Sequence, residues 1–275
     1  MKNSLSIINC QLSIKKKTIW ITGASSGIGE ACAYLYARQG VNLILTATRA
    51  ERLEEVRAGC IRLGAQCTLL PYDLSDLAHI DELVDKAMAA FGKIDLAFLN
   101  AGISQRSKIM DTETTVDEKI MAVNFFAPVK MSKRLLPAMI SQGGGTIAVT
   151  TSISGKFGFP LRSSYASSKF ALYGFFETLH AEYYDQNIRV VMVCPGRVKT
   201  NISYNALEAD GKKHGRMDDG QNSGISAENA AEKIVKAIEK QKPEVLVGGK
   251  ELLMVHIKRF FPGLARKMVR KIKAT

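Results

Sequence analysis

The amino-acid sequence predicts an α/β fold in which one doubly wound parallel sheet of about seven strands carries helices on both faces. Short apolar runs alternate with segments of helical periodicity from Thr18 onward, which is the pattern of repeated βαβ units. Three glycines follow the first apolar run, and no Pro/Gly/Ser-rich linker divides the chain. We therefore expect one domain over about residues 17–250, with an appendage at each end.

The first half of the chain contains four predicted strands. Each is a short, nearly continuous apolar run of the kind found in buried parallel strands. Their ranges are 18–22, 41–47, 66–73 and 93–102. The segments between them place apolar residues at helical spacing and end at glycines, which predicts helices over 29–40, 49–64 and 76–92.

The second half continues the alternation. A long helical region ends near Gln142 and leads into three further predicted strands. Their ranges are 145–152, 188–196 and 243–248. Helices are predicted between them at 163–186 and 227–241. Strands that alternate with helices imply parallel pairing through right-handed crossovers.

The positive charge of the chain is concentrated at its end. The net charge is +12, but the segment from Leu252 onward has no acidic residue and supplies Lys258, Arg259, Arg266, Lys267, Arg270, Lys271 and Lys273. More than half of the net positive charge therefore belongs to the C-terminal tail and not to the surface of the domain. This distribution argues against a nucleic-acid partner of the whole domain.

Cysteine, histidine and apolar patterns exclude several other classes of protein. Five cysteines and four histidines show no C-x-x-C or H-E-x-x-H pattern, which predicts reduced thiols, a cytoplasmic setting and no metal site. No run of about 18 apolar residues occurs, so no transmembrane helix is predicted. Residues 1–16 lack the unbroken apolar segment of a signal peptide and are expected to form a poorly ordered extension.

Gly23, Gly27 and Gly29 stand where the first predicted strand meets the first helix. Glycines at such a junction let the backbone approach a pyrophosphate, and the helix N-terminus attracts the anion. An ordinary strand-to-helix turn needs one glycine and not three. The motif therefore predicts a dinucleotide site and a Rossmann-type sheet, although its spacing is G-x-x-x-G-x-G and not the commoner G-x-G-x-x-G.

The end of the second strand bears on the choice between NAD(H) and NADP(H). An acidic side chain there binds the ribose 2′-hydroxyl in NAD-preferring sheets of this kind. Here Thr46, Ala47 and Thr48 are followed by Arg49, whose guanidinium suits a 2′-phosphate. We therefore predict NADP(H) in preference to NAD(H). The alternative, a solvated Arg49 at a helix N-terminus, stays open.

Seven motifs occur in order over about residues 18–200: TGASSGIG, YDLSD around Asp73, NAG at 100–102, VNFF with Asn124, TSISG with Ser152, YASSK at 165–169 and PGRVKT at 195–200. This set resembles the short-chain dehydrogenase/reductase (SDR) family. The segment after Thr200 resembles the lid of a dehydrogenase/reductase branch whose members are often membrane-associated. The resemblance also implies a homodimer or homotetramer.

The resemblance implies cofactor contacts on the matching motifs. They are Gly23, Ser25, Ser26, Gly27, Ile28, Gly29, Arg49, Asp73, Leu74, Asn100, Ala101, Gly102, Tyr165, Lys169, Pro195, Gly196, Val198 and Thr200. Asp73 would meet the adenine amino group. The basic residue that many NADP(H)-using relatives carry inside the glycine turn is absent, which weakens the NADP(H) prediction without reversing it.

The resemblance assigns catalysis to Asn124, Ser152, Tyr165 and Lys169. Tyr165 would exchange a proton with the substrate oxygen, and Lys169, one helical turn later, would favour the phenolate and bond the nicotinamide ribose. Ser152 would polarise the substrate oxygen, and Asn124 would anchor a water beside Lys169. The structural alternatives are a turn serine and an asparagine that bonds backbone where its helix bends.

The substrate pocket is expected to lie between the segment 155–162 and a lid at about 200–225. The predicted apolar wall is Phe157, Phe159, Leu161, Ile202, Tyr204 and Leu207. Lys156 and Arg162 are expected to face water, with recognition of an acid group as the alternative. The lid is rich in Gly, Asp and Lys, so we expect it to order around a ligand.

The basic amphipathic tail, residues 251–275, places Leu264, Met268 and Ile272 at steps of four. Such a helix either lies on an anionic membrane surface or packs on protein, and both interpretations stay open. The sequence as a whole predicts an NADP(H)-dependent oxidoreductase of a carbonyl or secondary alcohol, on a lipid-like substrate. The alternatives are a soluble dehydrogenase of a small polar alcohol and a catalytically idle dinucleotide-binding sensor or scaffold.

Overall fold

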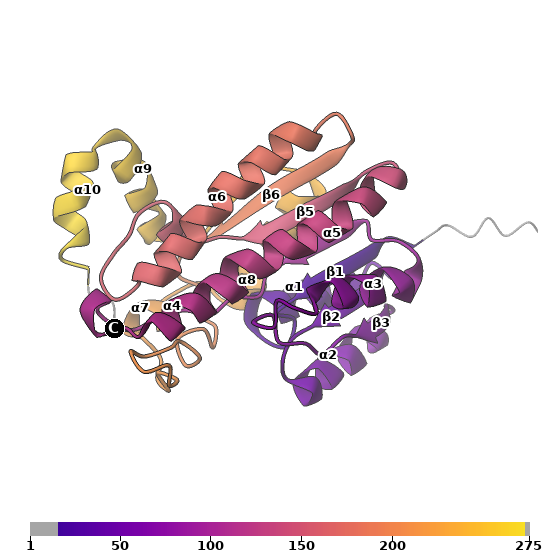
Figure 1. Ribbon diagram of the computed structural model, residues 1–275, viewed down its shortest axis with the longest axis horizontal. Coiled ribbons are helices and arrows are strands. Elements are labelled where there is room, and N and C mark those ends of the chain that lie inside the picture. Colours follow the sequence, from indigo (N-terminus) through magenta and orange to yellow (C-terminus); the bar gives the residue numbers. More distant parts are fainter. Residues whose placement is uncertain (1–15, 273–275) are drawn as a thin grey trace, which may run out of the picture.

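The computed structural model describes residues 16–272, so the predicted N-terminal extension falls almost wholly outside the described part. Seven strands form one parallel sheet in the order β3-β2-β1-β4-β5-β6-β7 (Figure 1). The strands are β1 (Thr18–Thr22), β2 (Asn42–Thr46), β3 (Gln66–Leu69), β4 (Leu96–Leu99), β5 (Gly145–Thr150), β6 (Ile188–Pro195) and β7 (Glu244–Val247). The predicted doubly wound sheet is confirmed.

Two strands, β3 and β4, are several residues shorter than the sequence suggests. β3 ends at Leu69, ahead of Pro71, and β4 ends at Leu99. β4 stops there because Asn100 turns toward β1, where its backbone N–H donates to Thr22 Oγ1 and its side-chain amide donates to Thr22 O. The turn brings the Asn100 side chain to the carboxyl edge of the sheet.

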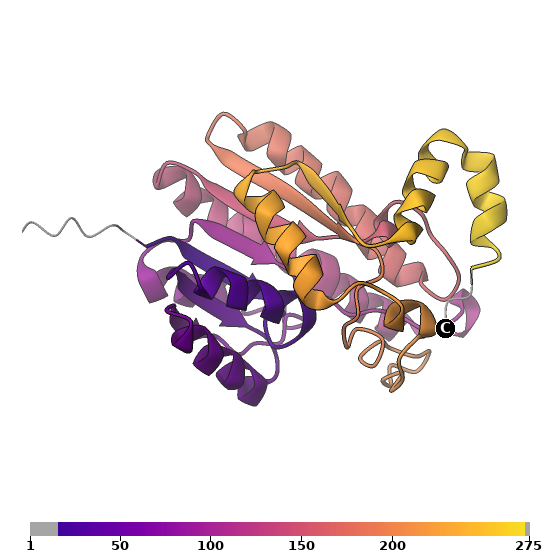
Figure 2. The same ribbon diagram turned by 180° about the vertical axis from the view of Figure 1, so that it is seen from behind.

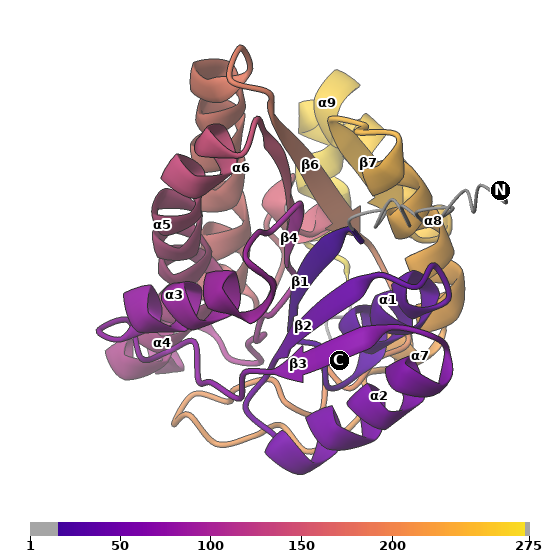
Figure 3. The same cartoon turned by 90° about the vertical axis from the view of Figure 1, so that its right-hand side faces the viewer.

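Helices cover both faces of the sheet (Figure 3). One face carries α1 (Gly27–Ala37), α2 (Ala50–Arg62) and α8 (Ala227–Glu239), and the other carries α3 (Ile80–Phe91), α5 (Ala127–Ser141) and α6 (Ser163–Tyr183). The three central residues of β1 are all apolar because both faces of the strand are buried: Ile19 and Ile21 enter one core, and Trp20 enters the other.

The remaining elements lie mainly at the carboxyl end of the sheet. They are η1 (Ile109–Asp111), α4 (Thr114–Met121), the π-helix η2 (Ala122–Phe126), η3 (Ile153–Gly155), α7 (Asp219–Asn222), η4 (Lys250–Leu252), α9 (Leu253–Phe260) and α10 (Pro262–Val269). α9 and α10 form a helical pair that stands out beside the start of α6 (Figures 1 and 2). Within residues 16–272, no helix has the length and apolar content needed to span a bilayer.

The strand order reverses between β1 and β4, since β2 and β3 lie to one side of β1 and the later strands to the other. In open parallel sheets this reversal leaves a crevice outside the carboxyl ends of the strands, and ligands bind there. The fold therefore predicts a ligand site at the carboxyl ends of β1 and β4.

Candidate active site

A cavity of about 1190 Å³ opens along the carboxyl ends of the strands. Nearly all the predicted cofactor and catalytic residues line it, from Gly23 in the glycine turn to Thr200 at the root of the lid. Of the predicted set, Gly29 and Asn124 do not line the cavity and stand one layer behind it. The structure therefore gathers motifs that are up to about 180 residues apart in the sequence into one cleft.

The glycine turn is a cradle that side chains would fill. Gly23 and Gly27 have φ of +66° and +59°. A Cβ on Gly29 would stand 2.3 Å from Gly23 O, and one on Gly23 would stand 2.8 Å from Ala101 Cα. The N-terminus of α1 can approach β1 and β4 this closely only without these side chains, so the geometry fits a bound pyrophosphate.

Arg49 extends the cradle beyond the end of β2. Its Nη2 lies 3.4 Å from the hydroxyl of Ser25, and both residues line the cavity. Asp73 lines the same end of the cavity, and its Oδ1 accepts from the backbone N–H of Ser75 at 2.9 Å. A guanidinium and a serine hydroxyl side by side are a donor pair that suits a phosphate group.

Asn100 ties three strands together at the floor of the cleft. Besides its bonds to Thr22 of β1, its Oδ1 accepts from Thr150 Oγ1 of β5 at 3.0 Å. The carbonyl oxygen of the same Thr150 accepts from Lys169 Nζ at 2.7 Å. Thr150 thus links Asn100, which lies beside the glycine cradle, to Lys169 of α6.

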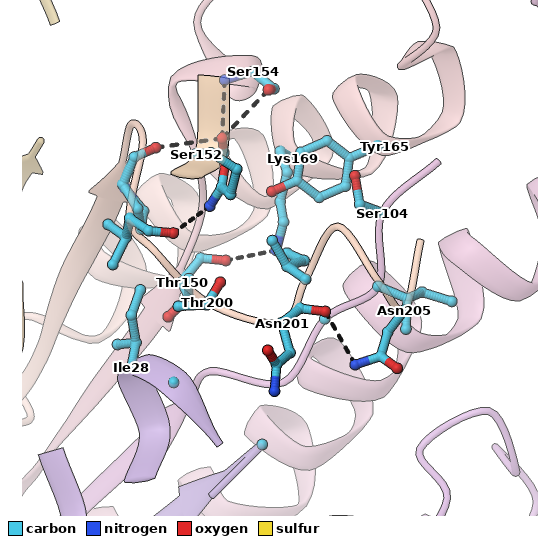
Figure 4. A pocket seen from close by; sticks show the side chains of 18 of the residues that line it. Ile28, Ser104, Thr150, Ser152, Ser154, Tyr165, Lys169, Thr200, Asn201 and Asn205 are labelled. Atoms are coloured by element: carbon cyan, nitrogen blue, oxygen red, sulfur yellow. Dashed lines mark hydrogen bonds between the residues drawn. The ribbon is translucent and has the colours of Figure 1, made fainter. Parts of the chain in front are cut away.

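Ser152, Tyr165 and Lys169 gather at the other end of the cavity (Figure 4). Tyr165 and Lys169 come from the first turns of α6, and the ammonium lies 5.8 Å from the centre of the phenol ring. Ser152 precedes η3, where its Oγ accepts from the backbone N–H of Ser154 at 3.1 Å. The serine is therefore a turn residue that also lines the cavity.

Burial has the largest effect on the pKa values of Tyr165 and Lys169. It raises the pKa of the Tyr165 phenol, although a hydrogen bond with Ser152 and the positive charges of Arg162 and Arg106 lower it. Burial also lowers the pKa of Lys169 to about 7. Near neutral pH the lysine can therefore gain or lose a proton readily.

Asn124 lies in η2, where the long helical region changes from α4 to α5 through one wide turn. Its Oδ1 accepts from Ile103 N at 2.9 Å, and its Nδ2 donates to Ile103 O and to Ser168 Oγ. This is the backbone bonding considered from the sequence. It also holds the loop after β4 against α6, one residue away from Lys169.

A buried ionic cluster, which sequence reasoning missed, borders the catalytic end. We call it the lid latch: Arg106, Arg162, Ser203 and Asp218. Arg106 donates to the Asp218 carboxylate through Nε at 2.9 Å and through Nη2, and Arg162 Nη2 lies 3.4 Å from the same carboxylate. Ser203 Oγ donates to Asp218 at 2.8 Å.

The lid latch corrects the expectation that Arg162 faces water, because Arg162 is buried among these groups. Burial lowers the pKa of Arg162 to about 9. Burial alone would raise the pKa of Asp218, but the bonds and charges of Arg106, Ser203 and Arg162 outweigh it, so the pKa is lowered. No local motif marks Arg106 or Asp218, which are 112 residues apart, so only the folded chain reveals the pair.

The predicted apolar wall is present in part. Phe157, Phe159, Ile202 and Leu207 line the cavity, whereas Leu161 and Tyr204 do not. Lys156 is also turned away from it, because its ammonium lies 2.8 Å from Glu244 and 3.6 Å from the centre of the Tyr173 ring. The Lys156 ammonium is therefore held in a partly exposed ion pair with Glu244.

The tail contributes to the cavity as well. Met254 and Ile272 line it, which the sequence did not suggest. The predicted apolar stripe, whose residues recur at steps of four, does not form one face. Leu264 and Met268 are exposed, whereas Ile272 packs inward with Phe157. α10 ends at Val269, so Ile272 lies past the helix and faces another way. Within the described residues, no group of three or more His, Cys, Asp or Glu side chains is arranged to hold a metal ion.

A doubly wound sheet with a glycine cradle and a tyrosine–lysine pair at its carboxyl edge defines a dinucleotide-dependent oxidoreductase. The family model described as short chain dehydrogenase matches residues 17–211. The chain belongs to this short-chain dehydrogenase/reductase family.

Curated relatives support the narrower resemblance. Dehydrogenase/reductase SDR family member 7B of Bos taurus is 38% identical over 259 residues, which cover 91% of this chain and 79% of the relative. The family protein 7-like of Drosophila melanogaster is 38% identical over 235 residues, 84% of this chain and 72% of the relative.

Solved structures share the fold. An alcohol dehydrogenase of Thermococcus sibiricus, complexed with 5-hydroxy-NADP, aligns with a TM-score of 0.74 at 26% identity, over 86% of this chain and 97% of that one. A short-chain dehydrogenase/reductase of Burkholderia phymatum, in complex with NAD, aligns at 0.80 and 23% identity, over 95% and 98%. One neighbour is thus bound to an NADP derivative and the other to NAD.

Proposed function

We propose that the protein reduces a carbonyl group with NADP(H), or oxidises the corresponding secondary alcohol, with Tyr165 as the acid/base. The observation that carries the proposal is the position of Ser152, Tyr165 and Lys169 in one cavity with the glycine cradle. When bound, the nicotinamide supplies or accepts the hydride. In the reduction the substrate oxygen, held by Ser152 Oγ, takes the proton of the Tyr165 phenol, and in the oxidation the alcohol gives its proton to the Tyr165 phenolate.

Lys169 acts from behind the phenol. Its amino group donates to Thr150 O and, when protonated, adds positive charge near the ring, which favours the phenolate needed for alcohol oxidation. Asn124 positions this lysine indirectly by holding Ser168 and the Ile103 backbone. The proton thus moves at the Tyr165 oxygen, while the lysine and asparagine set its surroundings.

The preference for NADP(H) rests on Arg49 and Ser25 and on the lack of an acidic residue at positions 46–48. Kinetic comparison of NADPH with NADH tests it. We expect Arg49→Ala to weaken NADP(H) binding by roughly 10- to 100-fold, the value of a charge-assisted hydrogen bond, with NAD(H) binding unchanged. Arg57→Ala, which removes an exposed arginine paired with Glu54, is the control. Tighter binding of NADH than of NADPH by the unaltered protein would overturn the preference.

The substrate is proposed to be lipid-like, because aromatic and aliphatic side chains form much of the wall near Tyr165. We further propose a peripheral position on the cytoplasmic face of a membrane and assembly as a homodimer or homotetramer. Turnover of aldehydes, ketones, 3-oxoacyl thioesters and steroids with NADPH tests the function. Absence of turnover across this panel, with intact cofactor binding, would favour a sensor or scaffold.

A further inference from the structure

The helical pair α9–α10, here called the C-terminal hairpin (residues 253–272), has two different faces. Its inner face carries Met254, Val255, Val269 and Ile272, which pack in one cluster with Ile153, Phe157 and Phe159 of the loop after β5. Two of these side chains, Met254 and Ile272, also line the cavity that contains Tyr165. The inner face is therefore part of the substrate wall.

The outer face exposes large apolar side chains. Leu253 is 62% exposed, Phe260 66% and Phe261 63%, and Leu264 and Met268 follow on α10. Phe260 and Phe261 form the turn between the helices, which Figures 1 and 2 show standing away from the sheet. Exposed aromatic side chains at adjacent positions form a patch that water does not favour.

Positive charge surrounds this apolar patch. Arg259, Arg266, Lys267, Arg270 and Lys271 are exposed on the same hairpin, and no acidic residue occurs beyond Glu251. A protein partner of ordinary mixed charge does not explain a segment with cations alone. An apolar patch within a field of cations is complementary to a bilayer with anionic headgroups, which offers both hydrocarbon and negative charge.

We infer that the C-terminal hairpin is a membrane-seated gate: its outer face lies on an anionic lipid surface while its inner face guides the apolar chain of an amphipathic carbonyl substrate from that surface to Tyr165. The inference rests on the proposed function for the carbonyl chemistry of the reacting group and for the lipid-like character of the substrate. The same short hairpin touches both the cavity and the surface, so the substrate chain need not cross bulk water.

The outer face is tested by flotation of the full-length protein with phosphatidylglycerol–phosphatidylcholine vesicles and with pure phosphatidylcholine vesicles. We expect binding to the anionic vesicles, lost in Phe260→Ser/Phe261→Ser and weakened roughly 30-fold in Arg266→Gln/Lys267→Gln, since each cation near such a surface contributes about 1 kcal/mol. Ile61→Ser/Leu63→Ser, which removes exposed apolar side chains at the end of α2, is the matched control and should bind normally.

The inner face is tested at two adjacent positions. Met254→Trp fills the cavity wall, whereas Leu253→Trp adds the same group on the outer face. We expect Met254→Trp to weaken dodecanol binding, measured by calorimetry, and to raise KM for dodecanal, each by about tenfold, the value of roughly two buried methylenes. Leu253→Trp should resemble the unaltered protein in both measurements.

Two results would overturn the inference: vesicle binding that survives Phe260→Ser/Phe261→Ser, or equal effects of Met254→Trp and Leu253→Trp on dodecanol. If vesicle binding survives and the same variant has lost a dimer, measured by light scattering, the outer face is an interface between copies of this chain. Failure of the proposed function is distinguishable, because it would abolish turnover of propanal and dodecanal alike and leave vesicle and dodecanol binding intact.

Discussion

Three influences act in opposite directions on the pKa of Tyr165. Burial holds the phenol protonated, whereas Ser152 and the guanidiniums of Arg162 and Arg106 favour the phenolate. The YASSK motif points to Lys169 as the neighbouring cation, but the lid latch adds two more that the motif does not contain. The acidity of Tyr165 is thus set by Arg106 on the loop after β4, by Ser152 after β5 and by Arg162 at the start of its own helix.

Removal of the phenol hydroxyl tests its role. Tyr165→Phe is expected to lower kcat by roughly 10²- to 10⁴-fold, the usual contribution of a positioned acid/base, without changing cofactor affinity. Tyr184→Phe, at an exposed tyrosine of the same helical segment, should keep full activity. Steady-state kinetics and cofactor titration give the answer. An equally active Tyr165→Phe would remove Tyr165 from the chemistry.

Lys169 should weaken the fold while it serves the reaction. The unfolded chain keeps a proton on this lysine up to about pH 10.5, whereas the native chain releases it near pH 7, so between these values the unfolded state binds more protons and stability rises with pH. Lys169→Met should therefore raise the free energy of unfolding by on the order of 2 kcal/mol at neutral pH, after subtraction of the lost bond to Thr150.

The gain from Lys169→Met should be constant below pH 7 and should disappear as the pH approaches 10.5. Urea denaturation of the cofactor-free protein at several pH values measures it, and the variant should be inactive. A stability difference that does not vary with pH would contradict the assigned burial of the charge.

Among the elements, those that depend on local patterning were predictable and those that depend on distant contacts were not. Seven apolar runs and six helical regions predict the sheet and its covering helices because buried parallel strands and amphipathic helices leave periodic signals. The glycine turn could be predicted for the same reason, because its three glycines are close together in the sequence. Arg106 and Asp218 belong to irregular segments, and their pairing depends on how the lid returns over the loop after β4. The two faces of the C-terminal hairpin also depend on what packs against them.

We expect the lid latch to hold the lid, residues 200–225, in place. Asp218→Asn leaves two buried guanidiniums without their carboxylate, which should lower the free energy of unfolding by about 3 kcal/mol, as for other broken buried pairs. Amide hydrogen exchange over residues 200–225 should become faster. Asp219→Asn, at the exposed neighbouring position, is the control. Unchanged exchange in Asp218→Asn would show that the lid is held elsewhere.

On the scale of the whole molecule, cofactor binding and stability are linked through the cradle. A ligand at 100 times its Kd adds about 2.7 kcal/mol to the free energy of unfolding. NADPH should therefore raise Tm of the unaltered protein. Gly29→Ala should abolish this rise, because its Cβ would stand 2.3 Å from Gly23 O and would displace α1 from β1.

The control for Gly29→Ala is Gly174→Ala, a helical glycine of α6 with nothing within 4 Å of the added Cβ. It should keep the NADPH-dependent rise in Tm and gain about 0.5–1 kcal/mol from its better helix propensity. Thermal unfolding with and without NADPH measures both variants. A Gly29→Ala protein that NADPH stabilises normally would contradict the tight approach of α1.

The contact between Gly27 and Thr200 has a consequence for the order of events in turnover. A Cβ on Gly27 would meet the Thr200 methyl group at 2.8 Å, so the root of the lid rests on the cradle itself. The same cavity is lined by the cradle, by Tyr165 and by Met254 and Ile272 of the C-terminal hairpin. We therefore expect a sequential mechanism of compulsory order, in which the nucleotide is first to enter and last to leave, so that product inhibition is competitive only between the two nucleotide forms.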